Sequence, residues 1–324
     1  MAGDIFVLVE HLNGKIGDVT FELLGTGREL ATASGGSVVA VLLGSGVRNL
    51  AADLGAADKV LLVEHPALAA YTPEAYKRAL CEILKARDPR ALLIANTAVG
   101  MDQAAGLSVE LGWPLVAYAK DVSFADGELR AVSQIYGGKI LAEAQVPGVR
   151  AIISVLAGSS PAEKGKITRG PAIEEAAVPG SLEGLRTRFK RLIVPEAGDV
   201  DITKEPILVS VGRGIGSQDN IPLVQELADA LGAALSASRP IVDQGWLPKS
   251  RQVGKSGMTV KPKLYIAVGI SGAPEHLEGM RSSATIVAIN TDAAAPIFGV
   301  AHYGVVGDLF DVLPALTEKI KGAA

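Results

Sequence analysis

Pro206-Ile-Leu-Val-Ser-Val-Gly-Arg-Gly-Ile-Gly216 decides the fold of this chain. Its first half is an apolar run with the length of a buried β-strand, and its second half is a glycine-rich turn. Apolar residues then recur at helical spacing, at Ile221, Val224, Leu227, Leu231 and Ala234. A strand, a glycine turn and a helix in this order predict one repeating unit of a parallel sheet covered by helices.

The same pattern continues to the end of the chain. Further strand-like runs lie at Leu264–Val268, Thr285–Ile289 and Pro296–Phe298. A last helical pattern has its apolar face at Leu309, Leu313, Leu316 and Ile320, with Asp308 as the expected N-cap. These runs predict a doubly wound α/β domain in the second part of the chain.

The first half alternates between strand-like and helix-like patterns. The strand-like runs are Ile5–Val9, Ser37–Leu43, Lys59–Val63 and Ala91–Ala95. Helical patterns lie between them, near Thr20–Thr32, Pro73–Ala86 and Asp102–Leu111. Four later runs are expected to be antiparallel additions: Leu115–Val122, Glu128–Ile135, Ala142–Val146 and Ala151–Val155. The fold class is therefore α/β with two doubly wound domains, the first a nucleotide-hydrolase-like domain with added β-strands.

The rhythm breaks between Pro161 and Glu205, where proline, glycine and charge dominate. We expect a solvated linker in this region, although the basic cluster Arg186–Arg191 could instead meet a partner chain. The predicted division is residues 1–185 for the N-terminal domain, which would contact a partner subunit, 186–204 for the linker and 205–324 for the second domain.

Bulk composition limits the class of protein. The chain has 324 residues, a formal net charge of −4 and 48% hydrophobic residues, so nothing favours nucleic-acid binding. Its single cysteine, Cys81, excludes an internal disulfide and lies in an apolar pattern typical of a core residue. No apolar run is long enough to cross a bilayer, and the first ten residues read as a strand. We expect a cytoplasmic prokaryotic protein without a signal or transit peptide and without membrane insertion.

The glycine motifs narrow the chemistry without naming it. Gly212–Gly216 is not the dinucleotide fingerprint, because its third glycine comes one residue early, so an NAD(P) oxidoreductase has little support. Arg213 could complement a pyrophosphate at this turn, or the glycines could serve turn geometry alone. Gln252–Gly257 contains Gly-Lys-Ser but lacks the first glycine of a Walker A loop. Two glycine loops that carry a serine and a histidine indicate a large cofactor.

Other polar residues allow two interpretations each. Arg239 could be a surface ion-pair partner or a permanent cation beside a redox-active ring. Asn290 follows an apolar strand and could read a ribose or adenosine group, or make an Asx turn. The four histidines have no metal-ligand spacing, so we expect no metal site.

Together these residues resemble the electron transfer flavoprotein alpha subunit (ETF alpha / FixB family). The matching blocks are Val-Gly-Arg-Gly-Ile-Gly (211–216), Ala-Ser-Arg-Pro (237–240), Gln-Val-Gly-Lys-Ser-Gly (252–257), Pro-Lys-Leu-Tyr-Ile-Ala-Val-Gly-Ile-Ser-Gly-Ala (262–273), Ile-Val-Ala-Ile-Asn (286–290), Ala-Pro-Ile-Phe (295–298) and Tyr-Gly-Val-Val-Gly-Asp-Leu (303–309). The resemblance is dense from about residue 208 to 313 and looser over residues 1–160.

The resemblance implies that the second domain binds FAD. It implies that Arg213 and Ser238 contact the diphosphate and that Arg239 lies over the isoalloxazine ring. Val253, Gly254 and Ser256 would line the N5/O4 edge, Ser271 to His276 would wrap the cofactor with His276 near N1/O2, and Asn290, Asp308 and Leu309 would reach the adenosine side. Arg239 and His276 would stabilise the negative charge of the reduced ring. The full implied set is Arg213, Ser238, Arg239, Gln252, Val253, Gly254, Lys255, Ser256, Ser271, Gly272, Ala273, Pro274, Glu275, His276, Asn290, Asp308 and Leu309.

The resemblance also implies a heterodimer with a beta subunit, which would hold AMP or a second FAD. Such a protein is a redox carrier more than a stand-alone enzyme, and it passes electrons from acyl-CoA or other dehydrogenases, as in fatty acid beta-oxidation, to a quinone oxidoreductase. Two alternatives are an electron-bifurcating subunit that uses NADH, and a non-redox nucleotide-binding regulatory subunit.

Three positions depart from the family pattern. Glu275 stands where the family usually has glutamine, and its carboxylate would disfavour an anionic ring. Lys255 replaces a commonly uncharged residue and could compensate Glu275. His302 stands where the family usually has aspartate. These departures leave the expected fold unchanged and bear on the flavin potential.

Overall fold

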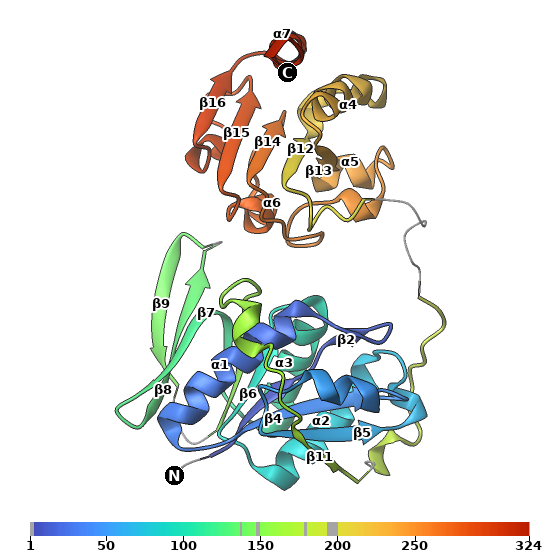
Figure 1. The fold of residues 1–324 in the computed structure, drawn as a ribbon, viewed down its shortest axis with the longest axis vertical. Coiled ribbons are helices and arrows are strands. Elements are labelled where there is room, and N and C mark those ends of the chain that lie inside the picture. The colour runs from blue at the N-terminus through green and yellow to red at the C-terminus, as the bar shows by residue number, and fades with distance from the viewer. Residues whose placement is uncertain (1–2, 137, 147–149, 178–179, 193–199, 324) are drawn as a thin grey trace. The chain divides into compact units, whose positions relative to one another are not determined.

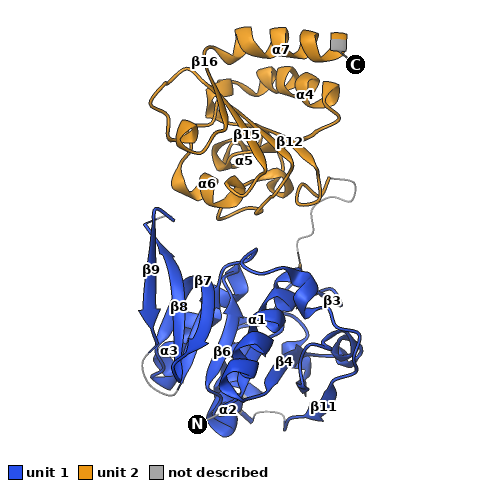
Figure 2. Cartoon of the chain, turned by 60° about the vertical axis from the view of Figure 1, so that its left-hand side comes forward, with its two compact units in different colours: residues 1–191 blue, residues 192–324 orange. Residues whose placement is uncertain are grey.

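The computed structural model describes residues 3–136, 138–146, 150–177, 180–192 and 200–323. The chain divides into two compact units, residues 1–191 and residues 192–324 (Figure 2). The predicted boundaries at 185, 186–204 and 205 stay a prediction, and residues 193–199 of that linker lie outside the described residues.

A sheet of nine strands forms the centre of the N-terminal unit (Figure 1). Its strand order is β11-β5-β4-β1-β6-β10-β7-β8-β9. The strands from β11 to β7 pair in parallel, whereas β8 and β9 continue from β7 as an antiparallel meander. The bounds are β1 Ile5–Leu8, β4 Val38–Gly44, β5 Lys59–Glu64, β6 Ala91–Ala95, β7 Leu115–Ala125, β8 Glu128–Ile135, β9 Ile140–Gln145, β10 Ala151–Val155 and β11 Ala172–Glu175, and a small hairpin joins β2 His11–Leu12 to β3 Lys15–Ile16.

Helices cover both faces of this sheet. Along β1, Ile5 and Val7 pack into one apolar layer and Phe6 and Leu8 into the other, as expected for a strand buried on both sides. Helix α1 (Asp18–Ser34) belongs to the first layer, and α2 (Pro73–Arg87) and α3 (Ala98–Leu111) belong to the second. The doubly wound fold predicted for this half is confirmed. Cys81 is 7% exposed in the second layer, as the sequence predicted.

The C-terminal unit holds a second, smaller sheet of five parallel strands in the order β13-β12-β14-β15-β16. The strands are β12 Ile207–Val211, β13 Ala234–Ala237, β14 Leu264–Val268, β15 Thr285–Asn290 and β16 Tyr303–Val306. The helices are α4 Ile221–Ala230, α5 Arg239–Asp243, α6 Pro274–Met280 and α7 Leu309–Ala323. The strand order reverses direction at β12, where the chain first goes to β13 and then crosses back to β14.

The two faces of this smaller sheet pack against different helices. Val209 and Val211 of β12 share an apolar layer with α4 and α7, whereas Leu208 faces the layer that contains Met280 of α6. Asp308 accepts a hydrogen bond from the backbone N–H of Phe310 at 2.9 Å, which confirms it as the N-cap of α7.

Four of the differences from the sequence prediction concern segments to which the sequence assigned another structure. Ala151–Val155 is not antiparallel but a parallel strand between β6 and β7, and its five buried residues explain its apolar composition. Pro296–Gly299 is a 3-10 helix and not a strand. Ala234 begins strand β13, because α4 already ends at Ala230. Part of the expected linker, Ala172–Glu175, pairs with β5 at the sheet edge, so this segment belongs to the N-terminal unit.

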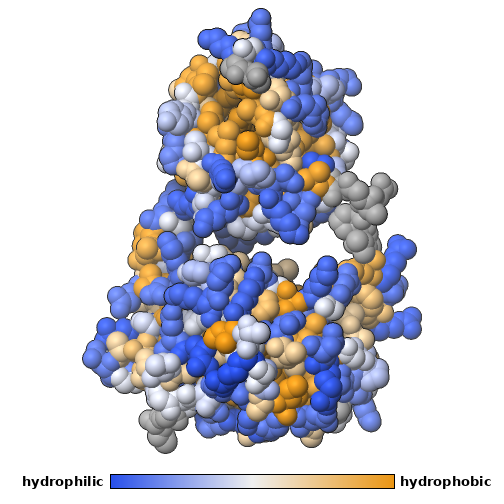
Figure 3. Space-filling view, in the orientation of Figure 1, coloured by the Kyte–Doolittle hydropathy of each residue, from blue (hydrophilic) through white to orange (hydrophobic). Residues whose placement is uncertain are grey.

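On the face that Figure 3 shows, apolar residues gather over the middle of the C-terminal unit, with polar residues around them. Among the described residues, none of the helices is long and apolar enough to cross a membrane.

Candidate functional site

A cavity of about 770 Å³ lies at the carboxyl edge of the five-stranded sheet. Every strand of that sheet contributes residues that follow it in the sequence. Arg213 follows β12, Ser238 follows β13, Ser271 follows β14, Asn290 ends β15 and Asp308 follows β16. The carboxyl edge of an open parallel sheet, next to the point where the strand order reverses, is the usual ligand site of this architecture.

Glycines let two of these loops touch. The backbone N–H of Gly214 donates to the carbonyl of Gly269 at 3.0 Å, and a Cβ on Gly214 would lie 2.8 Å from the Gly269 Cα. Gly269 itself has φ +59°, in the left-handed region that other residues avoid. Larger residues would push the loops after β12 and β14 apart, so the glycines of these two turns are required by packing. The loops then carry Arg213 and Ser271 into the cavity wall.

The segment from Gln252 to Gly257 forms another wall. Gln252 is fully buried, and its amide donates to the Ser256 hydroxyl at 3.0 Å and accepts from Lys249 at 3.2 Å. Gly254 has φ +133°, and a Cβ there would lie 2.8 Å from the Glu275 carbonyl oxygen. The Lys255 N–H donates to the same carbonyl at 2.7 Å. These contacts hold the loop against the start of α6.

The charged side chains of the cavity are largely exposed. Arg239 is 66% exposed, and its Nε donates to Asp243 Oδ2 at 3.1 Å along α5. Glu275 is exposed. Lys255 Nζ lies 3.9 Å from Glu278 Oε2. Because Arg239 remains charged at all ordinary pH values, it is the permanent positive charge at this end of the wall.

His276 lines the cavity but is buried, with 6% of its surface exposed. Burial is the larger influence on its pKa, and although the Val253 backbone acts in the opposite direction, the pKa falls to about 4. The ring is therefore neutral near pH 7. This state differs from the positive charge expected from the sequence, because a buried imidazole loses the hydration that would stabilise its charged form.

Asn290 and Asp308 already form hydrogen bonds within the protein. Asn290 donates from Nδ2 to the Ile270 carbonyl at 2.9 Å, and its Oδ1 accepts from the Asp292 N–H at 2.9 Å. The second contact is the Asx turn that the sequence left open as an alternative. Both residues still line the cavity.

The structure brings nearly the whole predicted set together. All of those residues line the cavity except Gly272 and Pro274, which adjoin it in the sequence. Gly272 has φ +86° and supports the turn against Ile297, and Pro274 begins α6. The sequence prediction missed ten other lining residues. Six of them lie inside the quoted motif blocks, namely Gly214, Pro240, Gly269, Ile270, Ala295 and Gly307, and the other four follow such blocks, namely Asp243, Thr291, Asp292 and Phe310.

His302 does not line the cavity. Its Nδ1 accepts a hydrogen bond from the Ile286 N–H at 3.0 Å, near the amino-terminal ends of β15 and β16. The cavity lies at the opposite ends of these strands. This departure from the family pattern is therefore a contact within the sheet and not part of the cavity wall.

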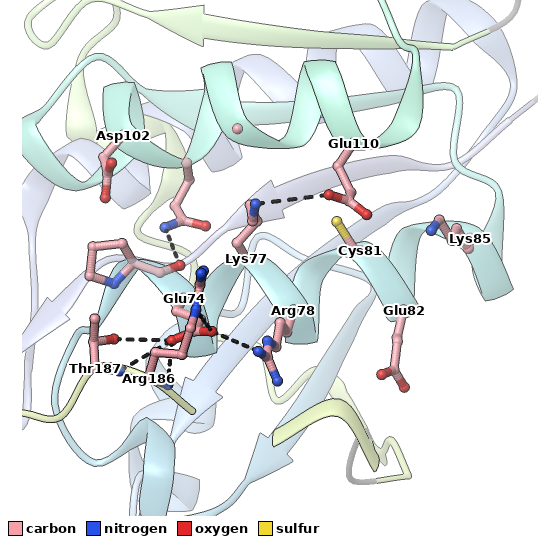
Figure 4. A pocket seen from close by; sticks show the side chains of 13 residues that line it. Glu74, Lys77, Arg78, Cys81, Glu82, Lys85, Asp102, Glu110, Arg186 and Thr187 are labelled. Carbon is pink, nitrogen blue, oxygen red and sulfur yellow. Dashed lines mark hydrogen bonds and ion pairs between the residues drawn. The ribbon is translucent and has the colours of Figure 1, made fainter. Parts of the chain in front are cut away.

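A second cavity of about 690 Å³ lies in the N-terminal unit, along α2 and α3 (Figure 4). Glu74 joins the segment of residues 186–187 to α2. Its carboxylate accepts from the backbone N–H groups of Arg186 and Thr187 at 2.8 and 3.2 Å and from Arg78 at 2.6 Å. Burial opposes this charge, but the hydrogen bonds from Arg186 and Thr187 outweigh it and lower the pKa of Glu74 to about 2. This groove is lined by charged groups that bind one another.

Two family models match the chain in succession. The electron transfer flavoprotein domain matches residues 5–181, and the electron transfer flavoprotein FAD-binding domain matches residues 201–281. The electron transfer flavoprotein subunit alpha of Thermoanaerobacterium thermosaccharolyticum is 40% identical over 98% of each chain. The subunit of the same name from Bacillus subtilis is 38% identical over 99% of this chain and 98% of its own. The acryloyl-CoA reductase electron transfer subunit beta of Anaerotignum propionicum is 35% identical over 98% of this chain and 95% of its own. The chain therefore belongs to the electron transfer flavoprotein alpha-subunit family.

Proposed function

We propose that this chain holds one FAD in the cavity at the carboxyl edge of its C-terminal sheet and carries electrons on it. The observation that carries the proposal is the convergence of five strand ends on one cavity. A FAD-binding domain matches residues 201–281, which include three of these strands, β12, β13 and β14. FAD supplies the redox chemistry by accepting and releasing electrons. The protein supplies a shaped wall and a local electric field.

The residues of the cavity fit such a group. Its volume of about 770 Å³ lies within the roughly 300–1,000 Å³ of ordinary ligand pockets. Gly254 and Gly269 let the loops of the cavity wall pack closely, since a Cβ on either would meet neighbouring backbone. His276 Nδ1 is buried and makes no hydrogen bond of normal geometry among the described residues, although the Val253 backbone raises the pKa of the ring. A cavity with glycine turns, polar side chains and the guanidinium groups of Arg213 and Arg239 suits a large anionic cofactor.

We assign roles within the cavity by residue type. Arg213 and Ser238 would bind the diphosphate, because a guanidinium and a hydroxyl donate to phosphate oxygens. Arg239 would lie over the isoalloxazine ring, and Val253, Gly254 and Ser256 would line its polar edge. Gln252 would act indirectly, since its side chain is bonded to Ser256 at 3.0 Å. Asn290, Asp308 and Leu309 would face the adenosine half.

The partners follow from the family. We propose a heterodimer with a beta subunit that works in the cytoplasm. Donors would be acyl-CoA or other dehydrogenases, and a quinone oxidoreductase or a similar protein would be the acceptor. The name of the Anaerotignum propionicum relative, an electron transfer subunit of acryloyl-CoA reductase, supports a role beside an acyl-CoA enzyme. The beta subunit would hold AMP or a second FAD.

A visible spectrum with a flavin count on this chain, co-purified with its beta subunit, tests the proposal. One FAD per heterodimer is the expected result for a simple carrier. Two would place a second FAD in the beta subunit and favour electron bifurcation. An intact heterodimer without flavin would contradict the proposal and favour a regulatory role.

A further inference from the structure

A row of polar side chains crosses an otherwise apolar layer in the C-terminal unit. Ser210 on β12 and Ser236 on β13 are cross-strand partners. Tyr265 on the neighbouring strand β14 is in register with Leu208, on the same face of the sheet as Ser210. All three polar side chains are fully buried. Polar groups in such a layer are costly unless they bind one another, so their grouping calls for a reason.

The row ends at the cavity. The Tyr265 hydroxyl lies 2.9 Å from Nε2 of His276, and His276 is part of the cavity wall. The two rings are inclined at 56° with their centres 6.2 Å apart, so they meet through their polar edges and do not stack. The Ser210 and Ser236 hydroxyls act to lower the pKa of Tyr265, although neither makes a hydrogen bond of normal geometry among the described residues.

The direction of the Tyr265–His276 bond follows from the surroundings. Burial raises the pKa of Tyr265, so its hydroxyl keeps its proton and can donate it. The Val253 backbone raises the pKa of His276 against the effect of burial, as a carbonyl oxygen near a ring N–H does, although Nδ1 makes no hydrogen bond of normal geometry among the described residues. Nε2 faces Tyr265, which leaves Nδ1 as the nitrogen that carries the proton.

We propose that Tyr265 is a positioning residue for His276, whose Nε2 accepts from the tyrosine hydroxyl while the imidazole proton sits on Nδ1. The ring then meets the cavity as a neutral group in one fixed tautomer. For the bound flavin this inference rests on the function proposed above. It follows that the positive charge of the cavity wall comes from Arg213, Arg239 and Lys255 and not from His276, which contributes an oriented polar ring.

Nitrogen NMR of the histidine rings tests the proposal directly. The chain, labelled with ¹⁵N-histidine and bound to its beta subunit, has only four histidines, so a His276→Asn variant identifies the signals of interest. We expect Nδ1 of His276 to be protonated and Nε2 to be a hydrogen-bonded acceptor from about pH 5.5 to 8, the interval in which an ordinary histidine titrates. A proton on Nε2, or a doubly protonated ring near pH 7, would overturn the proposal.

Removing one oxygen atom separates positioning from packing. Tyr265→Phe keeps the aromatic ring, and we expect the Nε2 signal to move toward that of an acceptor without a donor. Tyr71→Phe is the matched control, because the Tyr71 hydroxyl donates to Asp102 in the N-terminal unit. Unchanged His276 signals in Tyr265→Phe would contradict the proposal. If this variant does not fold, the tautomer of the unmodified chain still decides.

The flavin count in the same samples keeps the two proposals apart. An unmodified heterodimer without flavin that still shows the Nδ1–H tautomer would contradict the proposed function and support the role of Tyr265. A flavin-loaded heterodimer with the proton on Nε2 would support the proposed function and contradict the role of Tyr265.

Discussion

Two cavities of similar volume, one in each unit, differ in what their polar groups do. The groove in the N-terminal unit, about 690 Å³, is lined largely by charged side chains, and Glu74 already binds Arg78, Arg186 and Thr187. The cavity in the C-terminal unit, about 770 Å³, is walled by glycine turns, backbone and short polar side chains at five strand ends.

The difference teaches that volume alone does not mark a ligand site. In the groove, carboxylates and cations satisfy one another, so a ligand would have to break bonds that already exist. In the C-terminal cavity, glycines let the loops pack closely against one another, and His276 Nδ1 makes no hydrogen bond of normal geometry among the described residues. A site is therefore better recognised by polar groups that the fold leaves available.

We expect the largest effect from adding a side chain at a glycine turn of the C-terminal cavity. Gly272→Ala would place a Cβ 2.3 Å from the Ile297 backbone nitrogen at φ +86°. We expect a loss of about 3 kcal/mol in the free energy of unfolding of this unit, with loss of flavin, because backbone cannot move aside cheaply. Urea unfolding and flavin absorbance of the heterodimer measure both effects.

The matched control for that change is Gly245→Ala. Gly245 also has positive φ, +72°, but a Cβ there would meet nothing within 4 Å. Strain alone should cost about 1 kcal/mol and leave the flavin bound. Equal losses in the two variants would show that the close contact at Gly272 does not matter.

In the groove of the N-terminal unit, Glu74 is the residue to change. Glu74→Gln keeps the size of the side chain but removes the charge that holds Arg186 and Thr187. We expect faster hydrogen exchange at these two amides and no change in flavin content. Glu110→Gln is the control in the same groove, because Glu110 pairs with the end of Lys77, at 3.9 Å. Flavin loss in Glu74→Gln would refute the separation of the two cavities.

The pH dependence of the groove has a definite sign. The pKa of Glu74 is lowered from 4.5 to about 2 on folding, so its contribution to stability is complete above about pH 4.5. That contribution is lost as the pH falls from about 4.5 to about 2. Exchange at Arg186 and Thr187 should therefore rise over this interval in the unmodified chain and stay level in Glu74→Gln.

A smaller change sharpens the role of charge in the C-terminal cavity. Arg239→Ala removes a cation that is 66% exposed, so we expect the flavin potential to fall by only about 20 mV, or about 1 kcal/mol. Asp243→Asn should raise it by a similar amount, because the carboxylate that pairs with Arg239 at 3.1 Å is neutralised. A potentiometric titration in which both variants move the same way would rule out this electrostatic role.

The smallest effect concerns Glu275, which is exposed beside the cavity. Glu275→Gln should raise the flavin potential by roughly 10 mV, or about 0.5 kcal/mol, since water and salt screen an exposed charge. Glu226→Gln, on α4 and paired with Lys321, should leave the potential unchanged. A fall in Glu275→Gln would give the local field the opposite sign.

Much of this fold could be predicted from sequence because its signals are local. The strand of residues 207–211, its glycine turn and the Asp308 cap all depend on neighbours within a few positions. Several short strands escaped prediction, among them two in the C-terminal unit. Ala234–Ala237 continues the spacing of the preceding helix, and Tyr303–Val306 is an edge strand whose four residues are exposed, so no buried pattern marks it.

Contacts between distant residues set the limit for the site. Sequence placed His276 at the cavity but could not supply Tyr265, whose hydroxyl reaches it from strand β14. It also could not show that the ring is buried, which lowers its pKa. The bonds between Glu74 and Arg186 span 112 positions, and no local pattern announces them. Sequence motifs therefore predict which residues gather at the site. The protonation state of His276 and the hydrogen-bond partners of Glu74 can be read only from the folded structure.

The most direct test of the central claim is a crystal structure of the heterodimer loaded with FAD. We predict that the flavin ring lies in the C-terminal cavity, between Arg239 and the loop of residues 252–257. We expect the groove beside Glu74 to be free of flavin. A flavin bound elsewhere on this chain, or only in the beta subunit, would contradict this prediction.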